Sequence, residues 1–380
     1  MLKKHKKIKS ITVRWQKNIL LQLANKWVNK LRIKKGAANE NSLWWIFIYS
    51  AEQLIKKSLS DFIAGNYKFN PMTTYTFEDQ EYNESETIVI WGYIDRLVIK
   101  WIHKIIKPIL KHIIPASCFH LMGPSGVKAA IKKIKQAIGH KNFRYFIRAD
   151  IKSYYASIDH NILVKQVQQN FDDPRLLKYL SDIINISVIK DATVFTQNKG
   201  IPRRSSLSPF FGALYLSPLD KAFDKIKGVC YFRFMDDIVI LAETKKQYLK
   251  AKRKLQNILF KLKLSLSKHK TKMGKLEFGF HFLGVNFAVS QNQQDKIHAI
   301  VSIHDRSCCR ALDKINCMRE GAVYNPAYAQ GYLSKWAKWW SKTGSPYFSY
   351  IDCLRHWVQL VARGKFTSPF AWLGSGLVVI

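Results

Sequence analysis

The sequence is poor in acidic residues and lacks the spacings that make a metal site from cysteines. Asp and Glu number 26 against 62 Lys and Arg in 380 residues, which gives a formal net charge of +36. The six cysteines include no Cys-x-x-Cys pair, and no histidine cluster completes a zinc site. These absences argue against a zinc module, and we interpret the cysteines as mostly buried thiols in a reducing cytoplasm.

Long apolar runs are also missing. No stretch reaches the length of a membrane span, and the lysine-rich N-terminus is not followed by the apolar segment of a secretory signal. We therefore expect a cytoplasmic protein with no membrane partner. The excess of positive charge predicts a polyanionic partner, with nucleic acid ahead of an acidic membrane.

The pattern of apolar residues predicts an α+β fold. Helices are expected over 11–35, 43–63, 93–110 with an interruption at Pro108, 127–138, 160–170, 173–187 and 249–264, and a helical C-terminal module over about 305–364. Residues 65–90 are predicted to be irregular and to end in a strand at 87–91. Further strands are expected at 145–151, on both sides of Asp236, and within 277–289.

Two adjacent carboxylates, Asp236 and Asp237, interrupt an apolar run that extends from Val229 to Leu241. Burying two anions costs several kcal/mol per charge unless something neutralises them. A turn at Met235 and Asp236 would place both acids at the tip of a β-hairpin, where they can share Mg²⁺, which prefers oxygen ligands. The alternative is an ordinary polar turn between two strands. A third carboxylate upstream would favour the metal site.

Such a carboxylate exists at Asp150, which ends an apolar strand 86 residues before Asp236. Side by side, the two strands would direct their acids at one pair of metal ions, as in two-metal phosphoryl transfer. The loop at 199–209, between these strands, contains residues that shape the backbone or can donate to phosphates: Gly200, Pro202, Arg203 and Arg204.

These segments together resemble the motifs of bacterial reverse transcriptases of the group II intron and retron-like type. Asp150 with Tyr155 resembles the first palm motif, 200–209 resembles the motif G-x-P-x-x-x-x-L-S-P, and 234–237 resembles the x-x-D-D box. Residues 280–285 resemble the F-L-G primer-grip hairpin. The order and spacing of the motifs agree over residues 90–290, roughly half of the chain.

The resemblance implies a right-hand polymerase fold with fingers, a palm with an antiparallel sheet, and a helical thumb. We expect a basic helical N-terminal extension over 1–64, fingers and the start of the palm over 65–149, the palm over 150–290 and the thumb over 291–380. The implied activity is RNA-directed DNA polymerisation, with an RNA template, a DNA product and dNTPs as substrates.

The resemblance also implies roles for residues at the metal site. Two Mg²⁺ ions, with Mn²⁺ as a substitute, would be held by Asp150, the Ile151 carbonyl, Asp236 and Asp237. Lys270 stands where the family carries a lysine proposed to protonate pyrophosphate, and a further basic loop residue is the alternative. Tyr155 occupies the position of the aromatic steric gate that selects dNTPs over rNTPs, and an ordinary core tyrosine is the alternative.

Other implied contacts involve the nucleotide, the primer and the template. The nucleotide-binding candidates are Arg96, Arg148, Gly200, Pro202, Arg203 and Arg204, and the primer grip comprises Phe282, Leu283 and Gly284. In the thumb, three lysines interleave with Trp336, Trp339 and Trp340 and are assigned to phosphates: Lys335, Lys338 and Lys342. For the tryptophans, core packing and base stacking both remain open. Asp159 is expected to cap the helix that follows it.

One departure from the family pattern concerns template handling. Many relatives carry Gln-Gly after the motif proline, where this chain has Arg203 and Arg204. No endonuclease or RNase H pattern follows the thumb, so we expect a stand-alone enzyme with a noncoding RNA and a partner protein, in a retron-like or antiphage setting. The alternatives are a maturase-like or catalytically weak RNA-binding protein, and a template-independent or protein-primed DNA polymerase. The sequence does not determine the oligomeric state.

Overall fold

The structure is a computed structural model that describes residues 15–33, 43–79, 84–140, 142–191, 193–202, 205–291, 297–320 and 326–341. The chain divides into two compact units, each built from three separate segments. The first unit comprises Met1–Leu121, Ile151–Ala222 and Leu255–Ser265, and the second comprises Met122–Asp150, Phe223–Lys254 and Leu266–Ile380. Helices and strands occur in both units, in agreement with the predicted α+β class.

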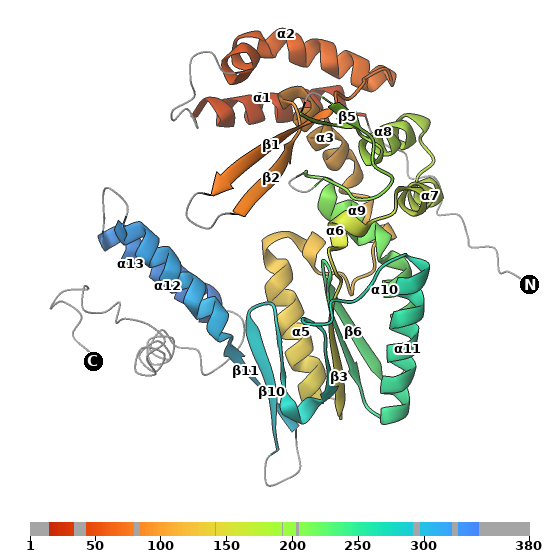
Figure 1. Cartoon of the computed structure of the whole chain (residues 1–380), viewed down its shortest axis with the longest axis vertical. Helices are drawn as coiled ribbons and strands as arrows, with labels where there is room; N and C mark the ends of the chain where they lie inside the picture. The colour runs from red at the N-terminus through yellow and green to blue at the C-terminus, as the bar shows by residue number, and fades with distance from the viewer. Residues whose placement is uncertain are drawn as a thin grey trace, which may run out of the picture. The chain divides into compact units, whose positions relative to one another are not determined.

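The second unit is built around a four-stranded antiparallel sheet in the order β6-β7-β3-β8, of which Figure 1 labels β3 and β6. Its strands are β3 (Tyr145–Asp150), β6 (Val229–Phe234), β7 (Asp237–Ala242) and β8 (Lys272–Lys275). In both central strands, β3 and β7, five consecutive residues are buried. Since successive side chains point to opposite faces, both faces of the sheet are covered. The strands predicted beside Asp150 and Asp236 are confirmed.

A second sheet and several helices complete this unit. The sheet has the order β11-β10-β9, formed by β9 (Phe280–Phe282), β10 (Val285–Gln291) and β11 (Ile297–Ile303). The rings of Phe146 and Phe280 stack at 5.1 Å and thereby join the two sheets. The helical elements are α5 (Gly126–His140), α11 (Lys245–Lys261), η2 (Leu276–Phe278), α12 (Asp305–Glu320) and α13 (Pro326–Ser341), and α11 continues into the first unit from Leu255 onward.

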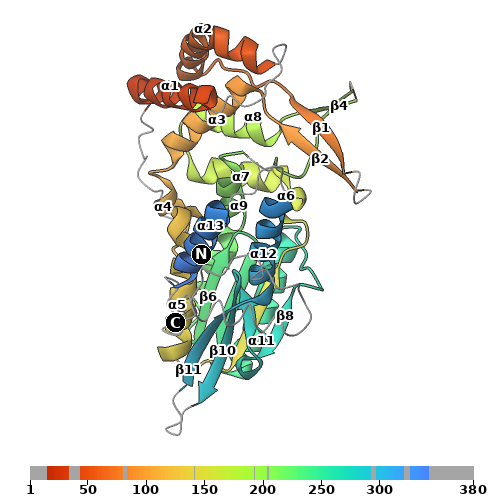
Figure 2. The ribbon, with the colours of Figure 1, turned by 90° about the vertical axis from the view of Figure 1, so that its left-hand side faces the viewer.

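The first unit is mainly helical. Its helices are α1 (Lys17–Ile33), α2 (Leu43–Ala64), α3 (Tyr93–Ile106), α4 (Leu110–Ile113), α6 (Tyr154–Ser157), α7 (His160–Asn170), α8 (Pro174–Ile184), α9 (Ser208–Tyr215) and α10 (Ser217–Phe223), and η1 (His120–Ser125) leads out of it. Figure 2 shows α1 and α2 packed together over α3. No helix among the described residues is long and apolar enough to span a membrane.

The prediction of an irregular segment before residue 87 is wrong. Strand β1 (Met72–Asp79) pairs antiparallel with β2 (Glu84–Ile90), and β1 also pairs in parallel with β4 (Val188–Lys190). A short strand, β5 (Thr193–Phe195), completes this sheet. Threonine and aromatic residues in β1 favour strands, although the segment is too polar to show a buried face. The predicted interruption near Pro108 is confirmed, because α3 ends at Ile106.

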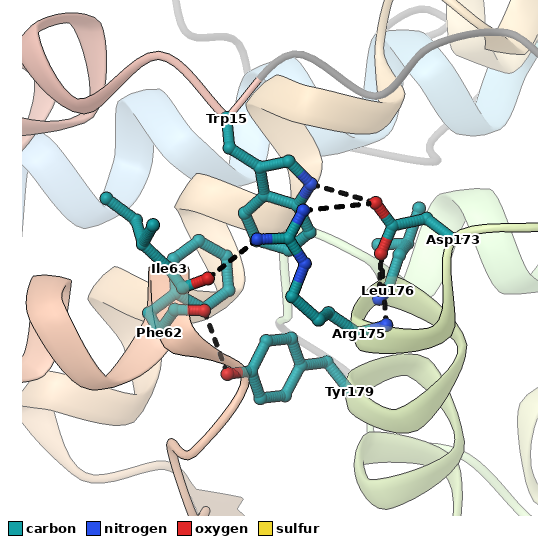
Figure 3. Close-up of polar contacts among 7 residues, drawn as sticks. All are labelled: Trp15, Phe62, Ile63, Asp173, Arg175, Leu176 and Tyr179. Carbon is teal, nitrogen blue, oxygen red and sulfur yellow. Dashed lines mark hydrogen bonds and ion pairs between the residues drawn. The ribbon is translucent and has the colours of Figure 1, made fainter.

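A polar cluster fixes the entry of α1 in the first unit (Figure 3). The Trp15 Nε1–H donates to Asp173 Oδ2 at 3.0 Å, and the Trp15 ring lies 5.0 Å from the ring of Phe62. The Arg175 guanidinium lies 4.4 Å over the Trp15 ring and donates through Nη1 to the Ile63 carbonyl at 2.8 Å. One tryptophan therefore links the chain before α1 to the end of α2 and the start of α8.

We predict that Trp15→Phe lowers the free energy of unfolding by about 1–2 kcal/mol, because phenylalanine keeps the ring packing but cannot donate to the Asp173 carboxylate. Urea denaturation measures the loss. Trp27→Phe is the matched control, since the Trp27 ring packs 5.8 Å from that of Phe47 and its indole N–H has no hydrogen bond to any residue that the structure describes. Equal losses in the two variants would contradict the role of the Trp15–Asp173 hydrogen bond.

Candidate active site

The predicted carboxylate hairpin is present. Phe234 pairs with Asp237, so Met235 and Asp236 alone form the turn between β6 and β7. Met235 has φ of 56°, in the left-handed region that costs a residue with a side chain about 1 kcal/mol or more. Arg233 is fully buried and donates from Nη1 to the Met235 carbonyl at 3.0 Å, which stabilises this turn. The sequence interpretation missed Arg233, although a charged residue inside an apolar strand was its signal.

The register of the sheet brings the acids together. Asp150 pairs with Asp237 across β3 and β7, and directly opposed residues of an antiparallel pair have Cα atoms ~4.5–5.5 Å apart. Asp236 occupies the adjoining turn. The structure thus places all three predicted acids at one end of a single sheet, within one compact unit. Ile151 follows Asp150 directly and is buried.

Two cations face these acids. Arg148 Nη2 lies 2.8 Å from Asp237 Oδ1, and Lys270 Nζ lies 3.7 Å from Asp150 Oδ1. Arg148 is itself buried, and its Nη1 donates to the backbone carbonyl of Lys270. Arg148, which we expected to contact the triphosphate or the template, is therefore held against Asp237 and the loop before β8. The Lys270 side chain is mostly exposed.

The surroundings of Asp237 disfavour the ionised form of its carboxyl group. Burial raises the pKa of this carboxyl to about 6; the Arg148 guanidinium opposes the rise, and the charges of Asp150 and Asp236 reinforce it. The net rise means that burial and like charge outweigh the ion pair. A further positive charge at this point would therefore stabilise the ionised form.

The donor chemistry of the site suits a hard cation. Asp237 Oδ1 is buried. It lies only 2.8 Å from Arg148 Nη2, but this ion pair lacks the geometry of a hydrogen bond, and no other described residue donates to the oxygen. The ion pair with Arg148 does not fully offset the burial of this carboxylate, and Mg²⁺ takes such oxygens as ligands. No group of three or more His, Cys, Asp or Glu side chains in the described part of the chain is arranged to hold a metal ion. The residues therefore fit Mg²⁺ by donor type rather than as a closed ligand set.

The first unit holds the residues assigned to nucleotide selection. Tyr155 lies in α6, and its carbonyl accepts a hydrogen bond from the Ile201 amide at 2.9 Å. Gly200 donates its amide to the Ile158 carbonyl at 2.7 Å and has φ of 91°. A Cβ on Gly200 would lie 3.3 Å from the Ala156 carbonyl oxygen, so the close approach and the positive φ both require glycine here. These backbone contacts fasten the loop containing Gly200 and Pro202 to the segment carrying Tyr155.

A second glycine, which the sequence interpretation missed, confines the tyrosine rings. A Cβ on Gly212, in α9, would lie 3.2 Å from Tyr154 Cε1 and 3.4 Å from Tyr155 Oη. The Tyr154 hydroxyl donates to the Gly212 carbonyl at 2.5 Å. A glycine inside an apolar helix was the available signal, because it marks a close approach.

Asp159 and Arg96 have local partners. The Asp159 carboxylate accepts from the Ile162 amide at 3.1 Å and from Lys263 Nζ at 2.6 Å, so its predicted capping role is confirmed. The Arg96 guanidinium stacks 4.5 Å over the Tyr93 ring. Three further assigned residues lie outside the described residues: Arg203, Arg204 and Lys342.

The primer-grip and thumb assignments fall in the second unit. Phe282 is buried, while Leu283 and Gly284 form a turn with φ of 51° and 82°. The Gly284 carbonyl accepts from the His304 amide at 2.9 Å, which ties this turn to the start of α12. On α13, two of the lysines assigned to phosphates, Lys335 and Lys338, are exposed. Trp340 is buried, whereas Trp336 and Trp339 are half-buried.

Known proteins match this part of the chain. A family model described as "Reverse transcriptase (RNA-dependent DNA polymerase)" matches residues 87–287. Protein YkfC of Escherichia coli K12 is 22% identical over 246 residues, which are 55% of this chain and 65% of that protein. Group II intron-encoded protein LtrA of Lactococcus lactis subsp. cremoris is 22% identical over 187 residues, 49% of this chain and 31% of that protein. The chain thus spans less than two thirds of each relative.

We predict that Asp237 makes chelator-treated protein less stable as the pH rises from about 4 to about 7. Its folded pKa of about 6 exceeds its ordinary 3.8, so its stabilising contribution is complete below 3.8 and is lost as the pH rises through 6. Two pKa units correspond to about 3 kcal/mol at most. Urea denaturation across this range should show the decrease in the wild type, and Asp237→Asn, which cannot ionise, should lack it.

Asp159→Asn supplies a control of opposite sign. Burial raises the pKa of Asp159, but hydrogen bonds from Lys263 and Ile162 lower it by more. The net pKa therefore lies below its ordinary value. Its contribution is therefore lost as the pH falls, not as it rises. If the unfolding free energy of the wild type depended on pH in the same way as that of Asp237→Asn, the raised pKa of Asp237 would be refuted.

Proposed function

The chain belongs to the reverse transcriptase family, and we propose that it extends a primer 3′-hydroxyl with dNTPs on an RNA template. The observation that carries the proposal is the cross-strand pairing of Asp150 with Asp237, with Asp236 in the adjoining turn. These acids lie inside the region that matches the family model. We further propose a basic helical extension at 1–64, fingers and the start of the palm at 65–149, the rest of the palm at 150–290 and a helical thumb at 291–380.

Asp150, Asp236 and Asp237, together with the Ile151 carbonyl, are the residues that would hold two Mg²⁺ ions. When bound, such ions lower the pKa of the primer hydroxyl and stabilise the leaving pyrophosphate. The ion pair with Arg148 fixes the orientation of Asp237, and the Arg233 hydrogen bond fixes the turn that carries Asp236. Lys270, 3.7 Å from Asp150, is the proposed proton donor to pyrophosphate.

Tyr155 is the proposed selector of the sugar. Its backbone is hydrogen-bonded to Ile201, and its ring abuts the position of Gly212, so its place is set from two sides. An aromatic ring held in this way can exclude a 2′-hydroxyl by steric conflict. The proposed partners are an RNA template, a noncoding RNA and a partner protein, in a retron-like or antiphage setting. The charge of +36 supports the nucleic-acid part of this proposal.

A second candidate function is an RNA-binding scaffold with weak catalysis. One observation favours it: within the described ranges no three acids converge as a ready metal site. The raised pKa of Asp237 favours the polymerase instead, because Arg148 offsets its burial only in part and a bound cation would complete the compensation. The two functions differ in whether the acids are needed for DNA synthesis.

We predict that the double variant Asp236→Ala with Asp237→Ala loses dNTP incorporation on a primed RNA template with Mg²⁺ by at least about 10²–10³-fold. RNA binding should remain nearly unchanged, because phosphate contacts by Lys and Arg supply most of it. Glu52→Ala with Asp172→Ala is the matched control, since it removes two negative charges from exposed positions. Undiminished incorporation by the double variant would exclude the site assignment, and inactive wild-type protein that binds RNA would favour the scaffold.

We predict that Tyr155→Ala raises the ratio of rNTP to dNTP incorporation by about 10–100-fold, because a small side chain leaves room for the 2′-hydroxyl. The ratio of kcat/KM values for a matched rNTP and dNTP measures the change. Tyr155→Phe retains the ring and should retain the selectivity. Unaltered selectivity in the alanine variant would make Tyr155 an ordinary core residue.

A further inference from the structure

The sheet β6-β7-β3-β8 has the three acids at one end and lies next to a group of lysines at the other. Asp150 and Asp237 mark one end, and the paired residues Tyr145, Ala242 and Val229 mark the other. Strand β3 is six residues long, so the two ends are ~17 Å apart along the strand. The turn before β6 and the first residue of α11 lie next to the end away from the acids.

Six cations lie in the turn before β6 and in the first nine residues of α11, and we call them the basal cationic surface: Lys225, Lys227, Lys245, Lys246, Lys250 and Arg253. All six are exposed. The turn and the helix are joined by a hydrogen bond from Gln247 Nε2 to the Lys227 carbonyl at 3.4 Å. Helix α11 has no Asp or Glu in its 17 residues.

The cations of this surface have no ion-pair partner in the part of the chain that the structure describes, although Asp224 and Glu243 flank them in the sequence. Other lysines of the chain have carboxylate partners: Lys263 pairs with Asp159 at 2.6 Å and Lys275 with Glu277 at 3.2 Å. None of the six residues of the basal cationic surface forms an ion pair with any residue that the structure describes. Like charges four residues apart on a helix repel each other, so an anionic partner would relieve a real cost.

The helix presents these cations outward because its other face is anchored. Ala251 and Leu255 are fully buried, and the Tyr248 ring stacks on Tyr145 of β3 at 5.4 Å. Lys246, Lys250 and Arg253 follow the i, i+4, i+7 spacing of one helix face, with steps of ~6 Å and ~4.5 Å along the axis. They form a row of donors rather than a single point.

We propose that the basal cationic surface is a second nucleic-acid-binding site, which binds the phosphate backbone of a duplex segment of RNA away from the carboxylates. An acidic membrane is disfavoured, because a membrane-bound helix needs a continuous exposed apolar face, and the apolar face of α11 that carries Ala251, Leu255 and Leu259 is buried. A protein partner would need an apolar anchor at the centre, and among the large apolar side chains between Lys245 and Arg253 only Leu249 is exposed.

A duplex is favoured over a single strand by the composition of the surface. Proteins bind unpaired bases by stacking them on exposed aromatic rings. The ring nearest these cations, Tyr248, is occupied by stacking on Tyr145, and the exposed ring of Phe260 lies ~10.5 Å beyond Arg253 along the helix. The inference does not rest on the proposed polymerase activity, because duplex binding at this surface needs none of the three acids.

The test compares two triple variants that carry the same net charge. Lys246→Gln, Lys250→Gln and Arg253→Gln remove three charges from the surface, and the control Lys57→Gln, Lys165→Gln and Lys190→Gln removes three exposed charges that are scattered over the first unit. The probe is a blunt RNA hairpin with a stem of about 20 base pairs, which offers no primer terminus. Fluorescence anisotropy at several salt concentrations gives the affinity and its salt dependence.

We expect the surface variant to bind the hairpin about 10-fold more weakly at about 150 mM salt, and its slope of log affinity against log salt to be smaller by about 2–3. The control should change neither quantity by as much. Equal behaviour of the two variants would overturn the proposal. Preferential, surface-dependent binding to phosphatidylserine vesicles instead of the hairpin would also overturn it, in favour of a membrane.

Two further arms separate this inference from the proposed function. Primer extension on a short RNA–DNA hybrid should be unchanged in the surface variant, and a parallel rise in KM for the hybrid would mean that the surface belongs to the primer-template site. The Asp236→Ala, Asp237→Ala protein should still bind the hairpin through the surface. A DNA duplex that binds with the same sensitivity supports recognition of the phosphate backbone, since only RNA carries the 2′-hydroxyl.

Discussion

The placement of three carboxylates, one buried and two half-buried, at the end of an apolar sheet is the constraint on which the second unit depends. β3 and β7 are central strands of the sheet, so the acids that terminate them are removed from water by the same packing that stabilises the strands. Arg148 meets Asp237 at 2.8 Å, yet the pKa of Asp237 stays near 6. The protein's own cations therefore compensate the acids only in part, and the remaining demand for positive charge is what makes the site suitable for metal-dependent chemistry.

The residues proposed for the chemistry and those proposed for the selection of substrate lie in different compact units. Asp150 ends the second unit's first segment, and Ile151 begins a segment of the first unit that also carries Tyr155. The position of the acids is set by strand register and by Arg233, whereas the position of Tyr155 is set by Gly200, Ile201 and the space at Gly212. Each set of contacts is internal to its own unit. Changes to selectivity can therefore arise in α9 or the Gly200 loop without disturbing the geometry of the carboxylates.

Features determined by neighbouring residues were predictable from the sequence. The two-residue turn at Met235 and Asp236, the strand that ends at Asp150 and the capping by Asp159 each follow from a short pattern. The contacts that were missed depend on register between distant segments: Arg148 meets Asp237 only because β3 and β7 pair as they do. β1 was missed for a related reason, since a polar, threonine-rich segment becomes a strand when β2 and β4 pair with it.

The distribution of charge shows why net charge alone does not locate a binding surface. Part of the positive charge is used internally: Arg148, Arg233 and Lys263 are committed to a carboxylate or to the turn carbonyl. The cations that can attract a polyanion are those without such partners, and the basal cationic surface concentrates six of them on one turn and one helix face. Because the acids lie at one end of the sheet and the row of cations begins near the other, the proposed metal site and the proposed phosphate-binding surface are separate.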